Sequence, residues 1–144
     1  YTADNGSKQR PIMIDCAPLG PTERFLSVLI EHTDGHFPYW LAPEQGRILT
    51  INDTVLDYVE EIEEVMNEIV LMSPVKYNEL RFSRDDRNES LGKKIRDASL
   101  MHIPVQLIVG PSDKKNRQVS VRGYKFERKV AIEDLHNTLM SIDR

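Results

Sequence analysis

The chain has 144 residues, of which 40% are hydrophobic and 29% charged, and its net charge at pH 7 is −4. This composition is typical of one globular domain, with enough chain to bury a hydrophobic core. No hydrophobic run approaches the roughly 20 residues of a membrane-spanning helix, so we expect no membrane partner. The single cysteine, Cys16, excludes an internal disulfide and indicates a reducing compartment. Because the first residue is Tyr1 rather than Met, we expect the chain to be part of a longer protein.

The charge is unevenly distributed along the chain. Residues 53–68 contain seven acidic residues and no basic one, whereas residues 79–129 contain thirteen Lys and Arg against seven Asp and Glu. This division is compatible with an acidic solvated helix and a basic half that binds a ligand. The acidic stretch is equally compatible with an ordinary exposed helix face.

The N-terminal part of the chain predicts one strand and one helix. Residues 11–17 alternate in polarity as a strand does, and two prolines and a glycine end the pattern. A helix is then expected from Thr22 to about Thr33. Thr22 is a suitable N-cap and Gly35 a suitable terminator.

The rest of the chain alternates between strand and helix patterns. We expect strands over residues 47–51, 80–84, 104–110 and 118–122, and helices over residues 54–70, 90–101 and 132–142. A connector is expected over residues 71–78, and a basic segment over residues 125–129 leads to the last helix. This order predicts an α/β fold with a mixed, mainly parallel sheet flanked by helices.

A specific resemblance lies in the stretch from Leu19 to Gln45. It is carried by Gly20, Glu23, Arg24, Phe25, Glu31, Gly35, Phe37, Pro38, Trp40, Leu41, Ala42 and Pro43. The stretch resembles the junction between the catalytic and C-terminal domains of threonyl-tRNA synthetases, which are class IIa enzymes. In that family the helix of class II motif 3 is followed by a Gly…Phe-Pro-x-Trp-Leu-Ala-Pro connector. The resemblance implies that residues 1–40 are a strand–helix remnant of the catalytic domain and that residues 41–144 are an anticodon-binding domain.

The resemblance also implies three anticodon-contacting residues. Asn88 matches the Asn of the family's Arg-Asn-Glu loop, Asp113 stands at the acidic position of its Gly-Asp-Lys-Glu turn, and Arg122 ends its Val-x-Val-Arg strand. Amide, carboxylate and guanidinium groups suit the base edges that an unstacked RNA loop exposes. We expect the three residues to converge on the anticodon, with Asn88 and Asp113 at the same edge of the sheet. The alternative is a surface Arg–Asp pair that caps loops.

Basic side chains around these loops are candidates for phosphate contacts, which position RNA without distinguishing bases. They are Lys93, Lys94, Lys114, Lys115 and Arg117. Either Asn88 or Ser90 is placed to cap the helix that begins near residue 90.

The catalytic assignment concerns the intact parent protein. By resemblance Arg24 is the motif 3 arginine, which contacts ATP, and the parent would use ATP and Mg. Motifs 1 and 2 are not in this sequence, so we expect this chain alone to bind no cofactor and not to activate threonine. Here Arg24 is expected to pair with Glu23 or Asp15.

Zinc binding is not expected. Asp15 stands where the family has a zinc-ligating His, and although Asp can ligate zinc through oxygen, it is an unusual replacement. Cys16 follows directly and would face the opposite side of the predicted strand.

The four histidines also offer no clear metal site. His32 and His36 have i, i+4 spacing, but Gly35 is expected to end the helix between them. His102 and His136 show no pattern of partners.

We therefore predict that the chain recognises a tRNA anticodon as the C-terminal part of a threonine–tRNA ligase. The resemblance implies a homodimeric parent that attaches threonine to tRNA at the expense of ATP. We expect the parent in the cytoplasm, with the mitochondrion as the alternative. The alternative function is a non-catalytic, synthetase-like RNA-binding or accessory protein that kept the fold.

Overall fold

The computed structural model describes residues 1–72 and 80–142 and divides the chain into two compact units, Tyr1–Asp34 and Gly35–Arg144. The connector predicted over residues 71–78 lies outside the described residues from residue 73 onward, and its first two residues end a helix. The boundary predicted after residue 40 stays a prediction. Tyr39, which precedes that boundary, is buried in the core of the second unit.

In the first unit, helix α1, Thr22–Thr33, confirms the predicted helix. Its N-cap is Pro21, with no capping side chain, so the assignment of Thr22 as N-cap was wrong. The helix ends where Asp34 and Gly35 adopt left-handed backbone angles, with φ of 52° and 73°. Asp34 and Gly35 together therefore end the helix, whereas Gly35 alone was expected to do so.

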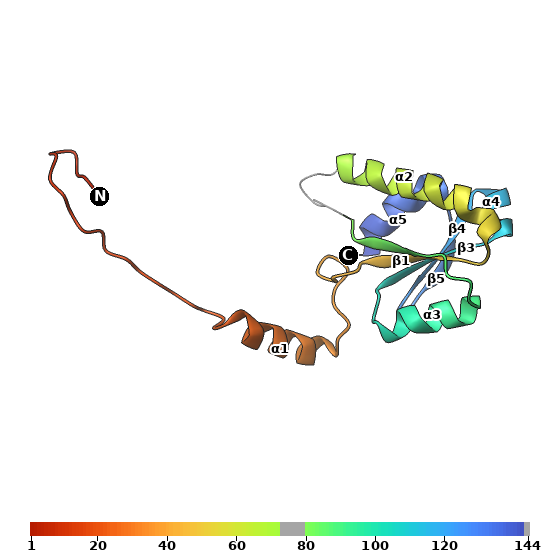
Figure 1. Cartoon of the computed structure of the whole chain (residues 1–144), viewed down its shortest axis with the longest axis horizontal. Helices are drawn as coiled ribbons and strands as arrows, with labels where there is room; N and C mark the ends of the chain where they lie inside the picture. Colours follow the sequence, from red (N-terminus) through yellow and green to blue (C-terminus); the bar gives the residue numbers. More distant parts are fainter. Residues whose placement is uncertain (73–79, 143–144) are drawn as a thin grey trace. The chain divides into compact units, whose positions relative to one another are not determined.

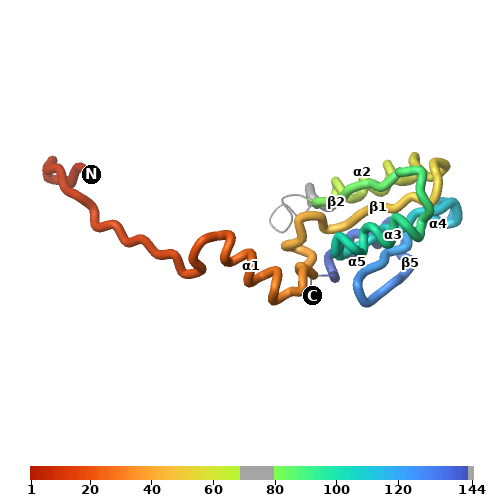
Figure 2. Tube along the Cα trace, turned by 60° about the horizontal axis from the view of Figure 1, so that its bottom comes forward, coloured from red at the N-terminus to blue at the C-terminus, as the bar shows by residue number. Residues whose placement is uncertain are grey.

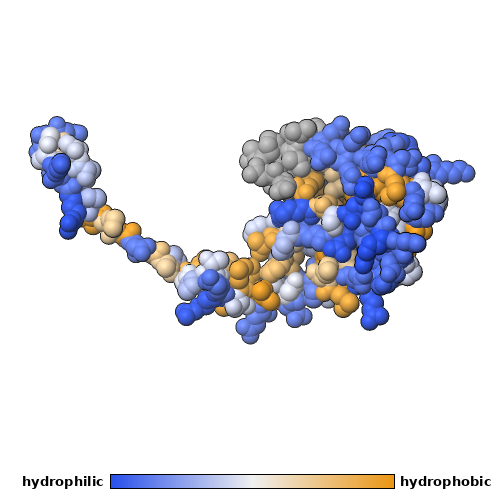
Figure 3. All heavy atoms as spheres, viewed as in Figure 1, coloured by the Kyte–Doolittle hydropathy of each residue, from blue (hydrophilic) through white to orange (hydrophobic). Residues whose placement is uncertain are grey.

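The strand predicted over residues 11–17 was wrong. These residues are extended but pair with no strand among the described residues, and Ile12 and Ile14 are 92% and 91% exposed. A strand forms only when its backbone groups have a partner strand. Among the described residues of this unit, the backbone pairing consists of a single β-bridge between Thr2 and Lys8. Helix α1 also buries none of its residues, and hydrophobic side chains are visible along this unit in Figure 3.

The second unit is built on one five-stranded sheet. Its strands are β1 Gly46–Thr50, β2 Phe82–Asp85, β3 Val105–Val109, β4 Gln118–Gly123 and β5 Glu127–Ala131, in the order β2-β1-β3-β4-β5. Strand β1 pairs in parallel with β2 and β3, whereas β4 pairs antiparallel with β3 and β5. The predicted mixed sheet with flanking helices is confirmed.

Helices cover both faces of this sheet. They are α2 Leu56–Met72 after a 3-10 turn at Asp53–Val55, α3 Leu91–Leu100, α4 Pro111–Asn116, and α5 Leu135–Ile142 after a 3-10 turn at Ile132–Asp134. Helices α2 and α5 lie on one face and α3 on the other, while α4 lies beyond one end of the strands (Figures 1 and 2).

The core lies between the sheet and helices α2 and α5. It contains alternate strand residues packed against helical residues at three- and four-residue spacing: Ile48, Leu107, Val119, Val121, Tyr58, Val59, Ile62, Leu135 and Leu139. Each fully buried side chain of this kind contributes about 1.5–3 kcal/mol relative to exposure. The periodicity of the sequence therefore gave the correct inner faces of these elements.

Two elements were not predicted. Strand β5 carries the exposed charged residues Glu127, Arg128 and Lys129, and such charges are common on edge strands, where they oppose pairing with other chains. Because these residues do not alternate with hydrophobic ones, the pattern gave no strand signal. Helix α4 has Pro111 at its first position and is only six residues long, so it was interpreted as a turn.

Candidate nucleic-acid interface

Asn88 lies at the tip of a tight turn between β2 and α3. The N–H of Glu89 donates to the carbonyl of Arg87 at 2.8 Å and closes the turn around Asn88. Asn88 is exposed, and Ser90 caps α3 by accepting from the N–H of Lys93. Of the two predicted caps, Ser90 is therefore the one used, which leaves the Asn88 amide facing solvent.

Arg87 holds this turn in place. Its Nε is 2.9 Å from Asp85 Oδ1 and its Nη2 is 2.7 Å from Asp85 Oδ2. The same Nη2 is 3.0 Å from Asp97 Oδ2 on α3. Asp85 is buried at the end of β2, so a planar, bidentate ion pair fastens the turn to both flanking elements. The sequence placed Arg87 in the matching loop but did not indicate this role.

This ion pair predicts a pH dependence of stability. The hydrogen bond from Arg87 is the main cause that holds the pKa of Asp85 below its ordinary value, against the opposing effect of burial. The resulting stabilisation is present above about pH 4, the ordinary pKa of Asp, and is lost as pH falls through the lower pKa of the folded state. We expect Arg87→Gln to lower the free energy of unfolding at pH 7 and to lower it less at pH 3.

Urea unfolding at both pH values measures the difference. Arg84→Gln is the control, because Arg84 pairs on the surface with Asp86 and Glu63 at 3.5 and 3.8 Å. An equal loss for Arg87→Gln at pH 7 and pH 3 would contradict the assignment to Asp85.

The prediction that Lys94 contacts phosphate was wrong, because its side chain is buried. Its Nζ donates to the carbonyls of Thr50, at 2.8 Å, and Asp85, at 3.1 Å, and lies 3.2 Å from Thr50 Oγ1. Only 1% of Lys94 is exposed. Lys94 follows Leu91 by three residues and precedes Ala98 by four, so its helical spacing already indicated the inner face of α3.

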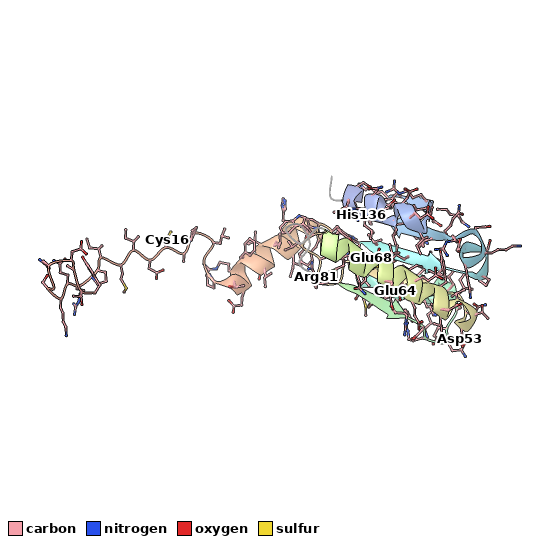
Figure 4. All side chains as sticks on the ribbon, turned by 90° about the horizontal axis from the view of Figure 1, so that it is seen from above. Cys16, Asp53, Glu64, Glu68, Arg81 and His136 are labelled. Carbon is pink, nitrogen blue, oxygen red and sulfur yellow. The ribbon has the colours of Figure 1, made fainter. Side chains whose placement is uncertain are left out.

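The other phosphate candidates differ in what they contact. Lys114 Nζ is 2.6 Å from Asp57, and Arg117 Nη1 is 3.1 Å from Glu61, both on α2. Other acidic residues lie along the same helix, as Glu64 and Glu68 in Figure 4 show. Lys93 pairs with Glu89 on the turn itself. Lys115 is exposed and has no ion pair or hydrogen bond among the described residues, so it is the candidate most available to a phosphate.

Asp113 is buried, and both of its carboxylate oxygens have partners. Oδ2 accepts from the N–H of Gly110 at 3.1 Å at the start of α4, and Oδ1 is 3.1 Å from Lys129 Nζ on β5. The Asp113 side chain is 8% exposed and that of Lys129 is 60% exposed, so Lys129 is the more accessible of the two to RNA. The anticodon role of Asp113 stays a prediction.

Arg122 lies on β4 opposite Gln106 of β3 and Glu127 of β5. Arg122 is half-buried, and its guanidinium has no hydrogen bond or ion pair among the described residues. A cavity of about 530 Å³ lies beside it, lined also by Gln106, His36, His102 and Tyr124. This volume is within the range of about 300–1,000 Å³ found for small-molecule sites.

The three predicted anticodon residues are only partly brought together. The turns that carry Asn88 and Asp113 follow parallel strands and lie at the same edge of the sheet, as expected, with β1 between them. Arg122, however, pairs with Gln106, three residues before the end of β3. At ~3.3 Å per residue, this position lies roughly 10 Å from the edge of the sheet that carries the two turns. The neighbouring Ser120 is buried, so this face is not the open surface that was expected. A single base cannot span these positions, whereas a loop of several bases can.

A cluster of three rings beside Arg122 was missed by the sequence analysis. The Nδ1 atoms of His36 and His102 are 3.1 Å apart, and the His36 ring centre is 4.6 Å from that of Tyr124. His36 and His102 are 66 residues apart, and no local pattern links them. Gln106 was also missed, although an amide within an otherwise hydrophobic buried strand was a visible signal.

Arg81, which is labelled in Figure 4, directly precedes β2 and attaches the connector before β1 to this strand. Its guanidinium donates to the carbonyls of Trp40 and Ala42 at 3.0 Å each, and its N–H donates to Gln45 Oε1 at 3.0 Å. The residues from Trp40 to Gln45 therefore form part of the second unit rather than a free linker. His36, Phe37 and Tyr39, which precede this attachment in the same unit, line the cavity beside Arg122.

In the first unit, Arg24 and Asp15 are both exposed. The expected pairing of Arg24 with Glu23 or Asp15 was wrong, because Arg24 makes no ion pair among the described residues. Nowhere in residues 1–72 and 80–142 do three His, Cys, Asp or Glu side chains gather as metal ligands would. The helices in these ranges are also too short or too polar to cross a membrane.

The chain matches the family of anticodon binding domains over residues 45–141. It is 45% identical over 122 residues to the threonine–tRNA ligase of Bacteroides fragilis, which covers 85% of this chain and 18% of that protein. It is 40% identical over 143 residues to the threonine–tRNA ligase of Chlorobium phaeovibrioides, which covers 98% of this chain and 20% of that protein. The chain therefore spans about a fifth of the length of these curated relatives.

Solved structures give the same similarity. The RNA binding domain of threonyl-tRNA synthetase from Cryptosporidium parvum superposes with a TM-score of 0.73 at 25% identity, covering 88% of this chain and 30% of that one. Prolyl-tRNA synthetase from the same organism superposes with a TM-score of 0.68 at 21% identity, covering 83% and 25%. The second similarity concerns the fold alone.

Proposed function

This chain belongs to the anticodon binding domain family, and from that premise we propose that it recognises a tRNA anticodon as the C-terminal part of a threonine–tRNA ligase. The observation that carries the proposal is the unpaired guanidinium of Arg122 beside a cavity lined by His36, His102 and Tyr124. Unstacked bases of RNA loops bind between aromatic rings and side chains that contact their edges. Threonine anticodons have G at the middle position, and guanine offers two acceptors to an arginine.

Asn88 supports the proposal from the end of the sheet. It is presented on a turn that Arg87 and Ser90 hold to β2 and α3, so little ordering is needed when RNA binds. A solvent-facing amide offers both a donor and an acceptor to a base. Asn88 and Arg122 would then contact different bases of one loop.

The activity of the parent forms part of the same proposal. The parent would attach threonine to tRNA with ATP and Mg, act as a homodimer in the cytoplasm, and contact ATP through Arg24. The exposed position of Arg24 here is consistent with a residue whose partners belong to a catalytic domain. The Asp15 substitution favours the second candidate, a non-catalytic relative that retains RNA binding, because it replaces a zinc-ligating residue.

Binding of anticodon stem-loops to the 144-residue chain tests the proposal. The probes carry G or A at the middle anticodon position, and their affinities are measured over a salt series. We expect tighter binding of the G loop and a linear fall of log affinity with log salt concentration. Equal affinity for the two loops and for an unrelated RNA hairpin would exclude anticodon recognition by this chain.

A separate prediction concerns phosphate contacts. Lys115→Ala should weaken the G and A loops by the same factor and lower the salt slope by about one unit, because one phosphate contact is lost. Lys114→Ala is the matched control and should change the slope less, since Asp57 already neutralises Lys114. If both variants lower the slope equally, Lys115 has no special part in binding.

A further inference from the structure

Gln106 has a buried polar atom with no partner. It is 5% exposed, and among the described residues its Oε1 accepts no hydrogen bond, whereas its Nε2 donates to Ser99 Oγ at 3.1 Å. The other residues of β3 are hydrophobic and buried. A buried oxygen without a hydrogen-bond donor destabilises the folded state, so a ligand that supplies the donor would explain why a glutamine stands at this position.

The orientation of this amide follows from its neighbour. Ser99 Oγ lies 2.8 Å from the carbonyl of Ile95, to which it donates its only hydrogen. Ser99 can therefore only accept from Gln106, so the amide nitrogen must face Ser99. The unpaired atom is the oxygen, and a ligand that satisfies it has to supply an N–H or O–H.

A donor stands beside this acceptor. Gln106 and Arg122 are direct neighbours on the paired strands β3 and β4, and both line the cavity of about 530 Å³. Directly opposed residues of an antiparallel pair have Cβ atoms about 4.5–5.5 Å apart. The Arg122 guanidinium supplies only donors, and Gln106 Oε1 is an acceptor buried in the wall of the cavity, so donors and an acceptor lie side by side on paired residues.

The walls of the cavity suit a flat ring. His36 has its ring centre 4.1 Å from that of His102 and 4.6 Å from that of Tyr124, and Tyr124 is 74% exposed. Exposed aromatic rings are common stacking surfaces for unpaired bases.

We propose that Gln106 is a further specificity-determining residue of this site and that the cavity binds an extruded guanine of an RNA loop. Guanine presents N7 and O6 as acceptors on its Hoogsteen edge, and the N1–H donor lies next to O6 on its Watson–Crick edge. Arg122 donates to N7 and O6, and Gln106 Oε1 accepts from N1–H. Adenine has a donor in place of O6 and an acceptor in place of N1–H, so it mismatches both residues. This inference rests on the proposed anticodon recognition and extends it to a residue that the family resemblance did not assign.

Gln106→Met tests the proposal, because Met keeps the length of the side chain and removes the oxygen. We expect the stem-loop with G at the middle position to bind about tenfold more weakly and the A loop to change less than twofold. The urea midpoint should stay the same or rise, since an unpaired buried oxygen has been removed. Gln118→Met makes the same change on β4 outside the cavity and should alter neither affinity.

A second measurement leaves the protein unchanged. A stem-loop with 1-methylguanine at the middle position keeps O6 and N7 but lacks the N1–H, and it should bind the unmodified chain about tenfold more weakly than the G loop. Unchanged binding of this loop, or a Gln106→Met variant that weakens the G and A loops equally, overturns the assignment of Gln106.

Two outcomes distinguish a failure of anticodon recognition from a failure of the role of Gln106. If the unmodified chain shows no preference for G over A, the proposed anticodon recognition fails and the role of Gln106 fails with it. If Arg122→Ala abolishes the preference while Gln106→Met retains it, only the role of Gln106 is wrong.

Discussion

Lys94→Met should lower the free energy of unfolding by about 2–4 kcal/mol, because it removes the donor shared by the carbonyls of Thr50 and Asp85. These carbonyls lie at the ends of β1 and β2, and Lys94 is 1% exposed, so water has little access to replace the ammonium group. The Thr50 hydroxyl lies in the same network and is 3.2 Å from the Asp85 carbonyl. Met fills similar volume, so the loss reports the hydrogen bonds rather than a cavity.

Lys93→Met is the matched control for this measurement. Lys93 precedes Lys94 on α3, but its exposed ion pair with Glu89 is worth only about 0.2–0.5 kcal/mol. Urea unfolding compares the two variants. The slope of the unfolding free energy against urea concentration should stay the same, so that a shift of the midpoint reports a change of stability. A Lys94→Met variant as stable as Lys93→Met would show that the two carbonyls find other donors. Because the network ends where the Asn88 turn begins, we also expect Lys94→Met to weaken stem-loop binding.

Arg122→Ala should weaken binding of the G loop by about 1–3 kcal/mol and reduce its preference over the A loop. The guanidinium contacts no other described side chain by hydrogen bond or ion pair, so its donors are available to a base. For the same reason the substitution should leave the folded structure largely unaffected. The effect should therefore appear in affinity and base preference, with little change in the urea midpoint.

The control for Arg122→Ala removes the same charge elsewhere. Arg96 is exposed on α3, does not line the cavity, and has no ion pair among the described residues. Arg96→Ala should weaken the G and A loops alike, through the electrostatic attraction of the domain for RNA. Should Arg122→Ala behave in this way too, and keep the original preference for G, Arg122 attracts phosphate rather than distinguishing bases.

The sequence determined by itself the features that depend on neighbouring residues. The hydrophobic spacing of α2 and the buried run of β3 placed those elements and their inner faces correctly, because local periodicity sets which side of an element is buried. Local sequence also limited the cap of α3 to Asn88 or Ser90, and the structure shows that it is Ser90. The same local rule failed for residues 11–17, because a strand pattern forms a strand only when a partner strand is present.

Only the tertiary structure decided which side chains are free to bind. Helical spacing indicates that Lys94 faces inward and Lys93 outward, but only the fold supplies the carbonyls of Thr50 and Asp85 that accept from the Lys94 ammonium group. Asp113 and Arg122 were predicted as equivalent base contacts, but Lys129 occupies the carboxylate while the guanidinium remains unpaired. The partners that make this difference come from strands and helices distant in the sequence, so only folding brings them into hydrogen-bonding range.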